Sequence, residues 1–264
     1  MTNLISHTFK DDKKKLVTFV TGGDPDFETS LQIIKTIVNN GADIIEIGMP
    51  FSDPMADGPT IQLSSNRAIS KEIDLKNIFS LASEAKKIKD DLPIILMGYY
   101  NLILYFGIEE FVKKCRQSGV DGLIIVDLQP EEDEDLINEL NKNQINLIRL
   151  ITPTTNEERL KMILKNASGF LYYISVMGIT GQKSADLNDL KKSVTFIKKN
   201  TTLPVVPGFG IKNSTDVNNI CKIADGAVVG SSIIKIIEEN LDNKEKMLLE
   251  IGRFTKELKR GTKV

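Results

Sequence analysis

Two carboxylates stand near the ends of one short stretch of this chain, and their settings differ. Glu46 lies within the apolar run 44–47, which a buried strand would place away from water. Asp57 lies in a segment that prolines and a glycine interrupt between residues 50 and 59. One rigid acid and one acid on a loop suit acid–base catalysis, because the first is preorganised and the second can close over a substrate.

Each of the two acids also has a purely structural interpretation. Glu46 can be a core carboxylate paired with a lysine or a tyrosine hydroxyl, and Asp57 precedes Gly58 in a common turn pair. A buried acid without a partner costs several kcal/mol unless it is neutralised. Glu46 in a buried strand therefore needs a reason.

Other catalytic groups are scarce in this sequence. His7 is the single histidine, and the two cysteines, Cys115 and Cys221, lie far apart. A zinc site therefore lacks ligands, and a Ser-His-Asp or Cys-His mechanism lacks a base. If the protein is an enzyme, we expect carboxylates to carry its proton transfers.

Composition and charge exclude several classes of function. The 264 residues are 41% hydrophobic and carry a net charge of -2, without the basic excess that a nucleic-acid backbone requires. We find no signal-peptide pattern and no apolar run of about 18 residues, so neither export nor a membrane span is expected. The cysteine usage also predicts a cytoplasmic protein.

Short apolar runs alternate with longer amphipathic ones along the whole chain. Most of the short runs are nearly continuous in apolar character, as in parallel strands that are covered on both faces. The expected strands are residues 16–21, 43–47, 93–98, 122–126, 146–151, 169–174, 204–207 and 226–229. The expected helices are residues 27–40, 74–89, 108–118, 131–143, 156–166, 187–199, 214–221 and 231–260.

This alternation predicts an α/β fold, a (β/α)8 TIM barrel that occupies residues 1–264 as a single domain. The extra segment 2–10 is expected to form a short helix that plugs the bottom of the barrel. The alternative is a doubly wound open sheet, but no G-x-G-x-x-G follows the first strand.

Three glycine-containing loops follow the last three expected strands and could bind an anion. The loops contain Thr180 and Gly181, then Phe209 and Gly210, then Gly230 and Ser231. Glycines let backbone N–H groups approach an anion, and a helix N-terminus adds a partial positive charge. Phosphate often binds at the seventh and eighth loops of a barrel, although one Gly-x-Gly alone can be a simple turn.

Apolar and aromatic side chains near the strand ends could complete a pocket. They are Phe19, Ile61, Leu96, Tyr99, Tyr172 and Phe209, and the alternative is that they are ordinary core residues. A flat apolar ligand between the two acids and the anion site would fit this arrangement. The long loop 175–186, rich in small residues, is expected to form a lid.

These motifs together resemble the tryptophan synthase alpha subunit family, and the resemblance covers essentially the whole chain. The most specific stretch is residues 46–59. The matching motifs are FVTGGDP at 19–25, EIGMPFSDPMADGP at 46–59, GYYN at 98–101, DL at 127–128, GITG at 178–181, GFGI at 208–211 and GS at 230–231.

The resemblance implies a retro-aldol cleavage of indole-3-glycerol phosphate to indole and glyceraldehyde 3-phosphate, without a metal or an organic cofactor. It implies that Glu46 moves protons and that Asp57 stabilises the positive charge that develops on the indole nitrogen. It assigns the phosphate to Gly181, Gly210, Gly230 and Ser231.

The resemblance also implies a partner, the pyridoxal-phosphate-dependent β subunit, in an αββα complex. Residues 50–54, Asn101 and residues 127–132 match surfaces that contact it. Two departures stand out: Gln129 precedes Pro130 where the family commonly has proline, and Gln182-Lys183-Ser184 replaces the usual sequence of the lid. Alternatives are a stand-alone lyase that releases indole, a non-catalytic allosteric barrel, and another sugar-phosphate barrel enzyme such as an isomerase.

Overall fold

The strands of the protein form a single parallel sheet with helices around it. The computed structural model describes residues 4–174, 187–208 and 210–264. Within these residues, nine strands pair in the order β5-β4-β3-β2-β1-β9-β8-β7-β6. They are β1 (Lys15–Thr21), β2 (Ile44–Gly48), β3 (Ile94–Gly98), β4 (Gly122–Ile125), β5 (Asn146–Leu147), β6 (Arg149–Ile151), β7 (Leu171–Ile174), β8 (Val205–Gly208) and β9 (Gly226–Val229).

The sheet closes into a barrel through the strand expected at residues 146–151. That strand is split at Ile148, so that β5 pairs with β4 and β6 pairs with β7. The Ile148 amide donates to the Leu123 carbonyl at 2.9 Å, which keeps the chain beside β4 across the split. The other seven strands lie within about two residues of their expected ends, and the (β/α)8 barrel is confirmed.

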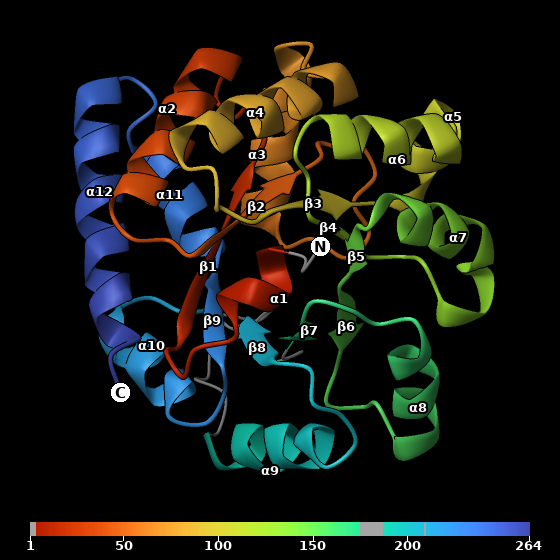
Figure 1. Cartoon of the computed structure of the whole chain (residues 1–264). Helices are drawn as coiled ribbons and strands as arrows, with labels where there is room; N and C mark the ends of the chain where they lie inside the picture. Colours follow the sequence, from red (N-terminus) through yellow and green to blue (C-terminus); the bar gives the residue numbers. More distant parts are fainter. Residues whose placement is uncertain (1–3, 175–186, 209) are drawn as a thin grey trace.

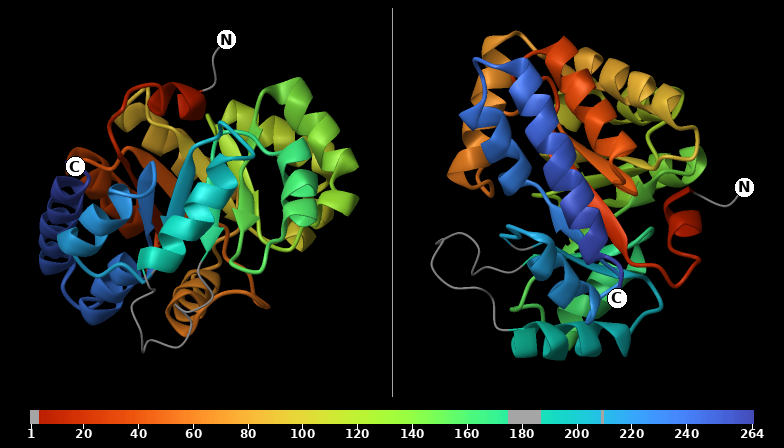
Figure 2. Two further views of the ribbon diagram at one scale, coloured as in Figure 1. Left: turned by 90° about the horizontal axis from the view of Figure 1, so that it is seen from below. Right: turned by 90° about the vertical axis from the view of Figure 1, so that its left-hand side faces the viewer.

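Apart from α1, which lies across one end of the barrel, the helices surround the strands in the views of Figures 1 and 2. They are α1 (Leu4–Thr8), α2 (Phe27–Asn39), α3 (Pro59–Ser70), α4 (Leu75–Ile88), α5 (Tyr100–Phe106), α6 (Ile108–Gln117), η1 (Pro130–Glu132), α7 (Glu134–Asn143), α8 (Glu157–Lys165), α9 (Leu187–Lys198), α10 (Ser214–Cys221), α11 (Ser231–Glu239) and α12 (Lys244–Gly261). Cys115 and Cys221 are buried on α6 and α10, as small core residues.

Two helices were not expected from the sequence, and one expected helix is wrong. Helix α3 buries the small residues Ser64, Ser65 and Ala68, so it lacks the apolar stripe that marks a helix, although Pro59 at its first turn is a favourable start. Helix α5 has only seven residues. The single helix expected at 231–260 breaks into α11 and α12, because Asn243 caps a new helix by accepting from the Lys246 amide.

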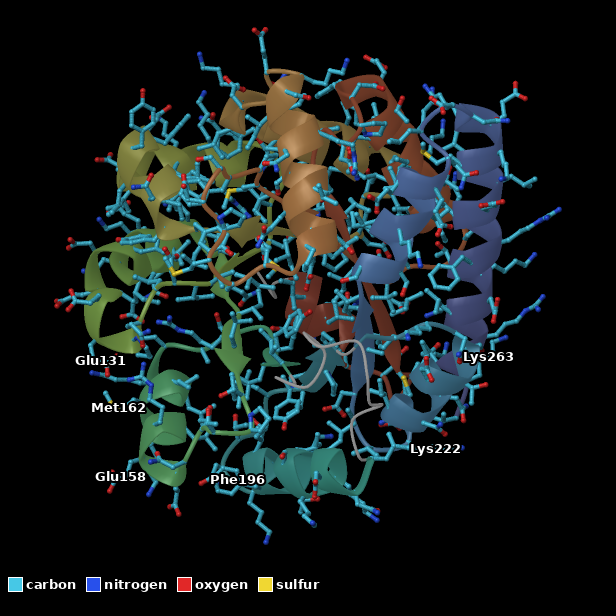
Figure 3. All side chains as sticks on the ribbon, turned by 180° about the vertical axis from the view of Figure 1, so that it is seen from behind. Glu131, Glu158, Met162, Phe196, Lys222 and Lys263 are labelled. Atoms are coloured by element: carbon cyan, nitrogen blue, oxygen red, sulfur yellow. The ribbon has the colours of Figure 1, made fainter. Side chains whose placement is uncertain are left out.

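The outer surface of the helices carries mostly polar side chains with some exposed apolar ones. Figure 3 shows Glu158 and Met162 projecting outward from α8, and Met162 is 43% exposed. In the part of the chain that the structure describes, we find no helix long and apolar enough to cross a membrane.

The barrel interior is filled at one end by a cluster of buried apolar residues, here called the inner cluster. It has one residue from α1 and one on or next to each strand, with Ile148 lying between β5 and β6. Its members are Ile5, Val17, Ile44, Ile95, Ile124, Ile148, Phe170, Val206 and Val228. In Figure 1 helix α1 lies in front of the strands, near the middle of the ring.

Close contacts confirm that α1 plugs the bottom of the barrel. Gly122 opens β4, and a Cβ added to it would lie 2.8 Å from Cδ1 of Ile5. Gly169 precedes β7, and its added Cβ would lie 3.2 Å from Cγ2 of Ile5. Phe9 adds a ring contact with Phe170, with 5.7 Å between the ring centroids. Ile5 therefore fills space that glycines leave at the amino ends of the strands.

We predict that Ile5→Ala lowers the free energy of unfolding by roughly 2–4 kcal/mol, because Ile5 is 0% exposed and its loss leaves a cavity between strands. Chemical denaturation monitored by circular dichroism measures the change. Leu249→Ala is the control, since Leu249 is 53% exposed on α12 and its replacement should change stability by less than about 1 kcal/mol. Equal effects of the two changes would contradict the role of α1.

Candidate active site

Glu46 is a fully buried carboxyl group on the inner face of the barrel. Side chains alternate along β2, and Ile44 belongs to the inner cluster, so Glu46 and Gly48 also face inward. Glu46 is 0% exposed, and neither of its carboxyl oxygens has a hydrogen-bond partner among the described residues. Burial raises the pKa of Glu46 to about 8, which favours the neutral acid.

Apolar and aromatic neighbours surround Glu46 instead of polar partners. Phe19 on β1 and Ile95 on β3 stand directly opposite it in the register of the two neighbouring strands. Tyr172 on β7 is half-buried, and its pKa is raised well above the usual value by burial and, secondarily, by the negative charge of Glu46. The structure thus brings Phe19, Tyr172 and Glu46 together inside the barrel.

Glycines make room for these aromatic rings. A Cβ added to Gly48 would lie 2.7 Å from Cζ of Phe19, and one added to Gly208 would lie 2.3 Å from the Tyr172 hydroxyl. Sequence reasoning missed the role of Gly48 and considered Gly208 only as part of an anion loop. The signal was available, because each glycine stands two residues after an inward-facing position of its strand.

Asp57 lies beyond the carboxyl end of β2, in the loop that leads into α3. Its carboxyl group is half-buried, and burial raises its pKa, while a hydrogen bond from the Tyr99 hydroxyl acts in the opposite direction. The Gln62 side chain donates to the Asp57 carbonyl at 2.8 Å, which ties this loop to the first turn of α3. Ile61, another predicted pocket residue, is partly buried in that same turn.

The residues of the predicted anion site that the structure describes lie after strands β8 and β9. Gly230 is the residue before α11, and Ser231 is its exposed first residue. The Ser232 hydroxyl donates to the carbonyl of Ile211, so the loops after β8 and β9 are linked. Gly210 is exposed, and a Cβ added to it would meet no atom within 4 Å. Thr180, Gly181, Phe209 and the lid at 175–186 lie outside the described residues.

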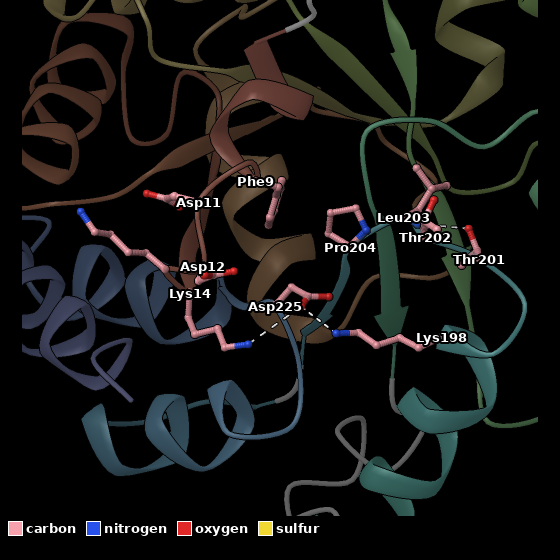
Figure 4. Close-up of a pocket in the computed structure, with 11 residues that line it drawn as sticks. Phe9, Asp11, Asp12, Lys14, Lys198, Thr201, Thr202, Leu203, Pro204 and Asp225 are labelled. Atoms are coloured by element: carbon pink, nitrogen blue, oxygen red, sulfur yellow. Dashed lines mark hydrogen bonds and ion pairs between the residues drawn. The ribbon is translucent and has the colours of Figure 1, made fainter.

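A separate pocket of about 320 Å³ lies at the opposite, amino end of the strands (Figure 4). Three of its charged side chains pair with each other: Lys198 and Lys14 lie 2.7 Å and 3.9 Å from the Asp225 carboxylate. Asp225 also accepts from the Val205 amide at 2.8 Å. These contacts explain the polar groups as structural ones that join the strand starts, so the pocket has no link to the two acids.

Barrels of this kind place their catalytic groups at the carboxyl ends of the strands, where Glu46 and Asp57 lie. The fold and the site therefore define a (β/α)8-barrel enzyme that is equipped for acid–base chemistry. A family model described as tryptophan synthase alpha chain matches residues 5–263. The chain belongs to this family, which cleaves indole-3-glycerol phosphate, and it is a lyase of tryptophan biosynthesis.

Individual relatives agree with the family model. The tryptophan synthase alpha chain of Petrotoga mobilis is 46% identical over 255 residues, which cover 97% of this chain and 98% of that protein. The crystal structure of tryptophan synthase subunit alpha from Legionella pneumophila superposes with a TM-score of 0.92 at 33% identity over 99% of each chain. An aminoacrylate-bound tryptophan synthase from M. tuberculosis gives a TM-score of 0.89 at 25% identity, with 99% of this chain and 100% of that chain covered.

The burial of Glu46 predicts a pH-dependent effect on stability. Its folded-state pKa of about 8 lies above the ordinary value of 4.5, so the stability that it contributes is complete below pH 4.5 and is lost as the pH rises through 8. We therefore expect Glu46→Gln to become more stable than the wild type at pH 9. The gain relative to pH 5 should reach several kcal/mol, since one pKa unit is worth about 1.4 kcal/mol.

Urea denaturation of both proteins at pH 5, 7 and 9 measures this difference. Glu257→Gln is the matched control, because Glu257 is exposed on α12. A stability difference between Glu46→Gln and the wild type that stays constant over this pH range would show that Glu46 is not held in a desolvated site.

Proposed function

We propose that Glu46 and Asp57 carry out the cleavage of indole-3-glycerol phosphate, Glu46 as the proton-transfer group and Asp57 as the charge-stabilising group. The observation that carries the proposal is the complete burial of Glu46 without a partner on the inner face of β2. A structural carboxylate would be expected to have a hydrogen-bond donor. An acid that must exchange protons with a substrate has a reason to lack such a hydrogen-bond donor in the free protein.

The reaction requires a proton at the indole ring before a bond can break. The neutral acid of Glu46, favoured by its raised pKa, protonates C3 of the indole and gives an indolenine cation. The resulting carboxylate then accepts the proton of the hydroxyl group on the adjacent side-chain carbon. As that O–H bond breaks, the carbonyl forms and the carbon–carbon bond cleaves. Its electron pair returns to the ring, which releases indole and glyceraldehyde 3-phosphate and leaves Glu46 protonated again.

Asp57 has the complementary task in this proposal. Protonation at C3 places positive charge on the indole nitrogen, and an ionised carboxylate that accepts its N–H stabilises that charge. The Tyr99 hydrogen bond supports this role, because it lowers the pKa of Asp57 against the effect of burial.

The remaining predicted contacts complete the binding site in this proposal. We assign the indole and glycerol portions to Phe19, Ile61, Tyr99, Tyr172 and Phe209. The phosphate would be bound by Thr180, Gly181, Gly210, Gly230 and Ser231. The support is that Gly230 and Ser231 open helix α11 and that Ser232 links this helix to the loop containing Gly210.

We predict that Glu46→Gln and Asp57→Asn each reduce indole release by about 100-fold or more, because each removes a group that acts on the reacting atoms. The measurement is a steady-state assay of indole release from indole-3-glycerol phosphate. Asp53→Asn, an exposed residue of the same loop, is the control and should keep a rate close to that of the wild type. A rate near that of the wild type in either test variant would refute its assigned role and favour a non-catalytic barrel.

We further propose that this chain works with a tryptophan synthase β subunit in an αββα complex in the cytoplasm. The support is three exposed apolar side chains, called here the docking surface: Met55 on the loop that carries Asp57, and Leu104 and Tyr105 on α5, which are 82%, 54% and 93% exposed. Burial of such side chains against a partner protein is favourable. The docking surface includes the loop that carries Asp57, so contact with a partner could influence the chemistry.

The support for the cytoplasm is the state of the two cysteines. Two free, buried cysteines fit a reducing compartment.

Binding to the β subunit can be tested on the docking surface. We expect the β subunit to co-purify with this chain and to raise its rate of indole release. Tyr105→Ser should weaken binding about tenfold or more, because it removes a large exposed aromatic side chain, while the rate of the free chain stays unchanged. Met162→Ser, an exposed apolar residue on α8, is the control. A high rate alone together with no binding would identify a stand-alone lyase.

A further inference from the structure

Tyr99 contacts the loop that carries Asp57 through both its ring and its hydroxyl group. It lies between β3 and α5 and is 2% exposed. Its ring stacks on Phe51, with 5.2 Å between centroids and 30° between planes. Its hydroxyl oxygen accepts a hydrogen bond from the Ala56 amide at 3.1 Å and also bonds the Asp57 side chain. Residues 51, 56 and 57 of the loop are thus all attached to one side chain.

The direction of these hydrogen bonds follows from the groups involved. The Ala56 amide can only donate, so the Tyr99 oxygen accepts from it. The hydroxyl hydrogen then remains for the Asp57 carboxylate, which can only accept when ionised. The hydroxyl hydrogen is therefore used by the loop, and Tyr99 can donate a hydrogen bond to a ligand only if its bond to Asp57 breaks.

The next strand of the barrel fixes the backbone beside Tyr99. The Tyr100 amide donates to Oδ1 of Asp127 at 2.8 Å, and the Val126 amide donates to the Gly98 carbonyl at 2.9 Å. These bonds join the carboxyl end of β3 to the segment after β4 on both sides of Tyr99. The Tyr100 amide belongs to the first turn of α5, where it has no partner within the helix. Asp127 therefore stabilises both the start of α5 and the position of Tyr99.

We propose that Tyr99 is a positioning residue for Asp57: its hydroxyl holds the carboxylate and the loop in place, and Asp127 holds Tyr99. The inference rests on the proposed catalytic role of Asp57, and it assigns to the Tyr99 hydroxyl a task separate from the substrate contact proposed for its ring. The contacts run from the end of β4 through the start of α5 to the loop after β2. They connect residues 127–132, which match a partner surface of the family, to an acid at the mouth of the barrel.

The decisive test is the titration of Asp57 in Tyr99→Phe. This change keeps the ring that stacks on Phe51 and removes only the hydroxyl group. A carboxylate that loses a donor is less stable in its charged form, so the pKa of Asp57 should rise, by about one unit. The probe is ¹³C NMR of protein labelled at aspartate carboxyl groups, with the Asp57 signal assigned from Asp57→Asn. Among the described residues, Asp127 is the other ionisable group that acts on this pair.

Activity gives a second, independent measurement. In Tyr99→Phe we expect kcat to fall about tenfold with KM changed less than about twofold, as for the loss of one hydrogen bond to a charged group. The acid limb of the kcat profile should move to higher pH together with the Asp57 signal.

Tyr100→Phe removes a hydroxyl from the adjacent residue and keeps its amide, so it should behave like the wild type. Asp127→Ala should reproduce part of the Tyr99→Phe effect, and Asp127→Asn, which keeps an acceptor oxygen, should restore most of it.

Two outcomes separate this inference from the proposed function. An unchanged Asp57 titration and an unchanged kcat in Tyr99→Phe, with Asp57→Asn inactive, would overturn the positioning role and leave the catalytic role of Asp57 intact. Full activity of Asp57→Asn would overturn the proposed function and this inference with it.

Discussion

The central constraint in this protein is a carboxyl group that lies inside the barrel without a polar partner. Removal of Glu46 from water is costly for its charged form, and no described residue compensates with a hydrogen bond. The group can be kept there because it can remain neutral and because the register of the sheet fixes its strand on both sides. A rigid, desolvated acid with a pKa close to neutrality is suited to giving and taking protons.

The two ends of the barrel are built differently around this acid. At the amino end of the strands, the inner cluster, which includes Ile5 of α1, packs the interior. Toward the carboxyl end, the inward-facing positions on β2 and β8 are glycines instead of larger residues. The rings of Phe19 and Tyr172 occupy the space beside these glycines. The same alternation of side chains thus produces a packed floor below Glu46 and an aromatic environment around it.

Asp57 is held in place by side chains and not by the pairing of strands. Its loop has no regular secondary structure, so its position depends on side chains from elsewhere in the chain. Tyr99 contacts this loop through stacking and through hydrogen bonds, and Asp127 fixes the backbone beside Tyr99. A carboxylate held in this way can move with its loop, whereas Glu46 cannot move without disturbing the sheet.

The sequence alone determined the periodic elements and the identity of the two acids. Continuous apolar runs marked the strands, since parallel strands are covered on both faces, and residues 46–59 pointed to the family. The sequence did not predict helix α3, because this helix packs through small residues. It did not predict the break at Ile148, because the break depends on pairing with strands on either side. The missing partner of Glu46 and the bond between Tyr99 and Asp57 were decided only by the tertiary structure. Both depend on which side chains, distant in sequence, the closed barrel brings together or keeps apart.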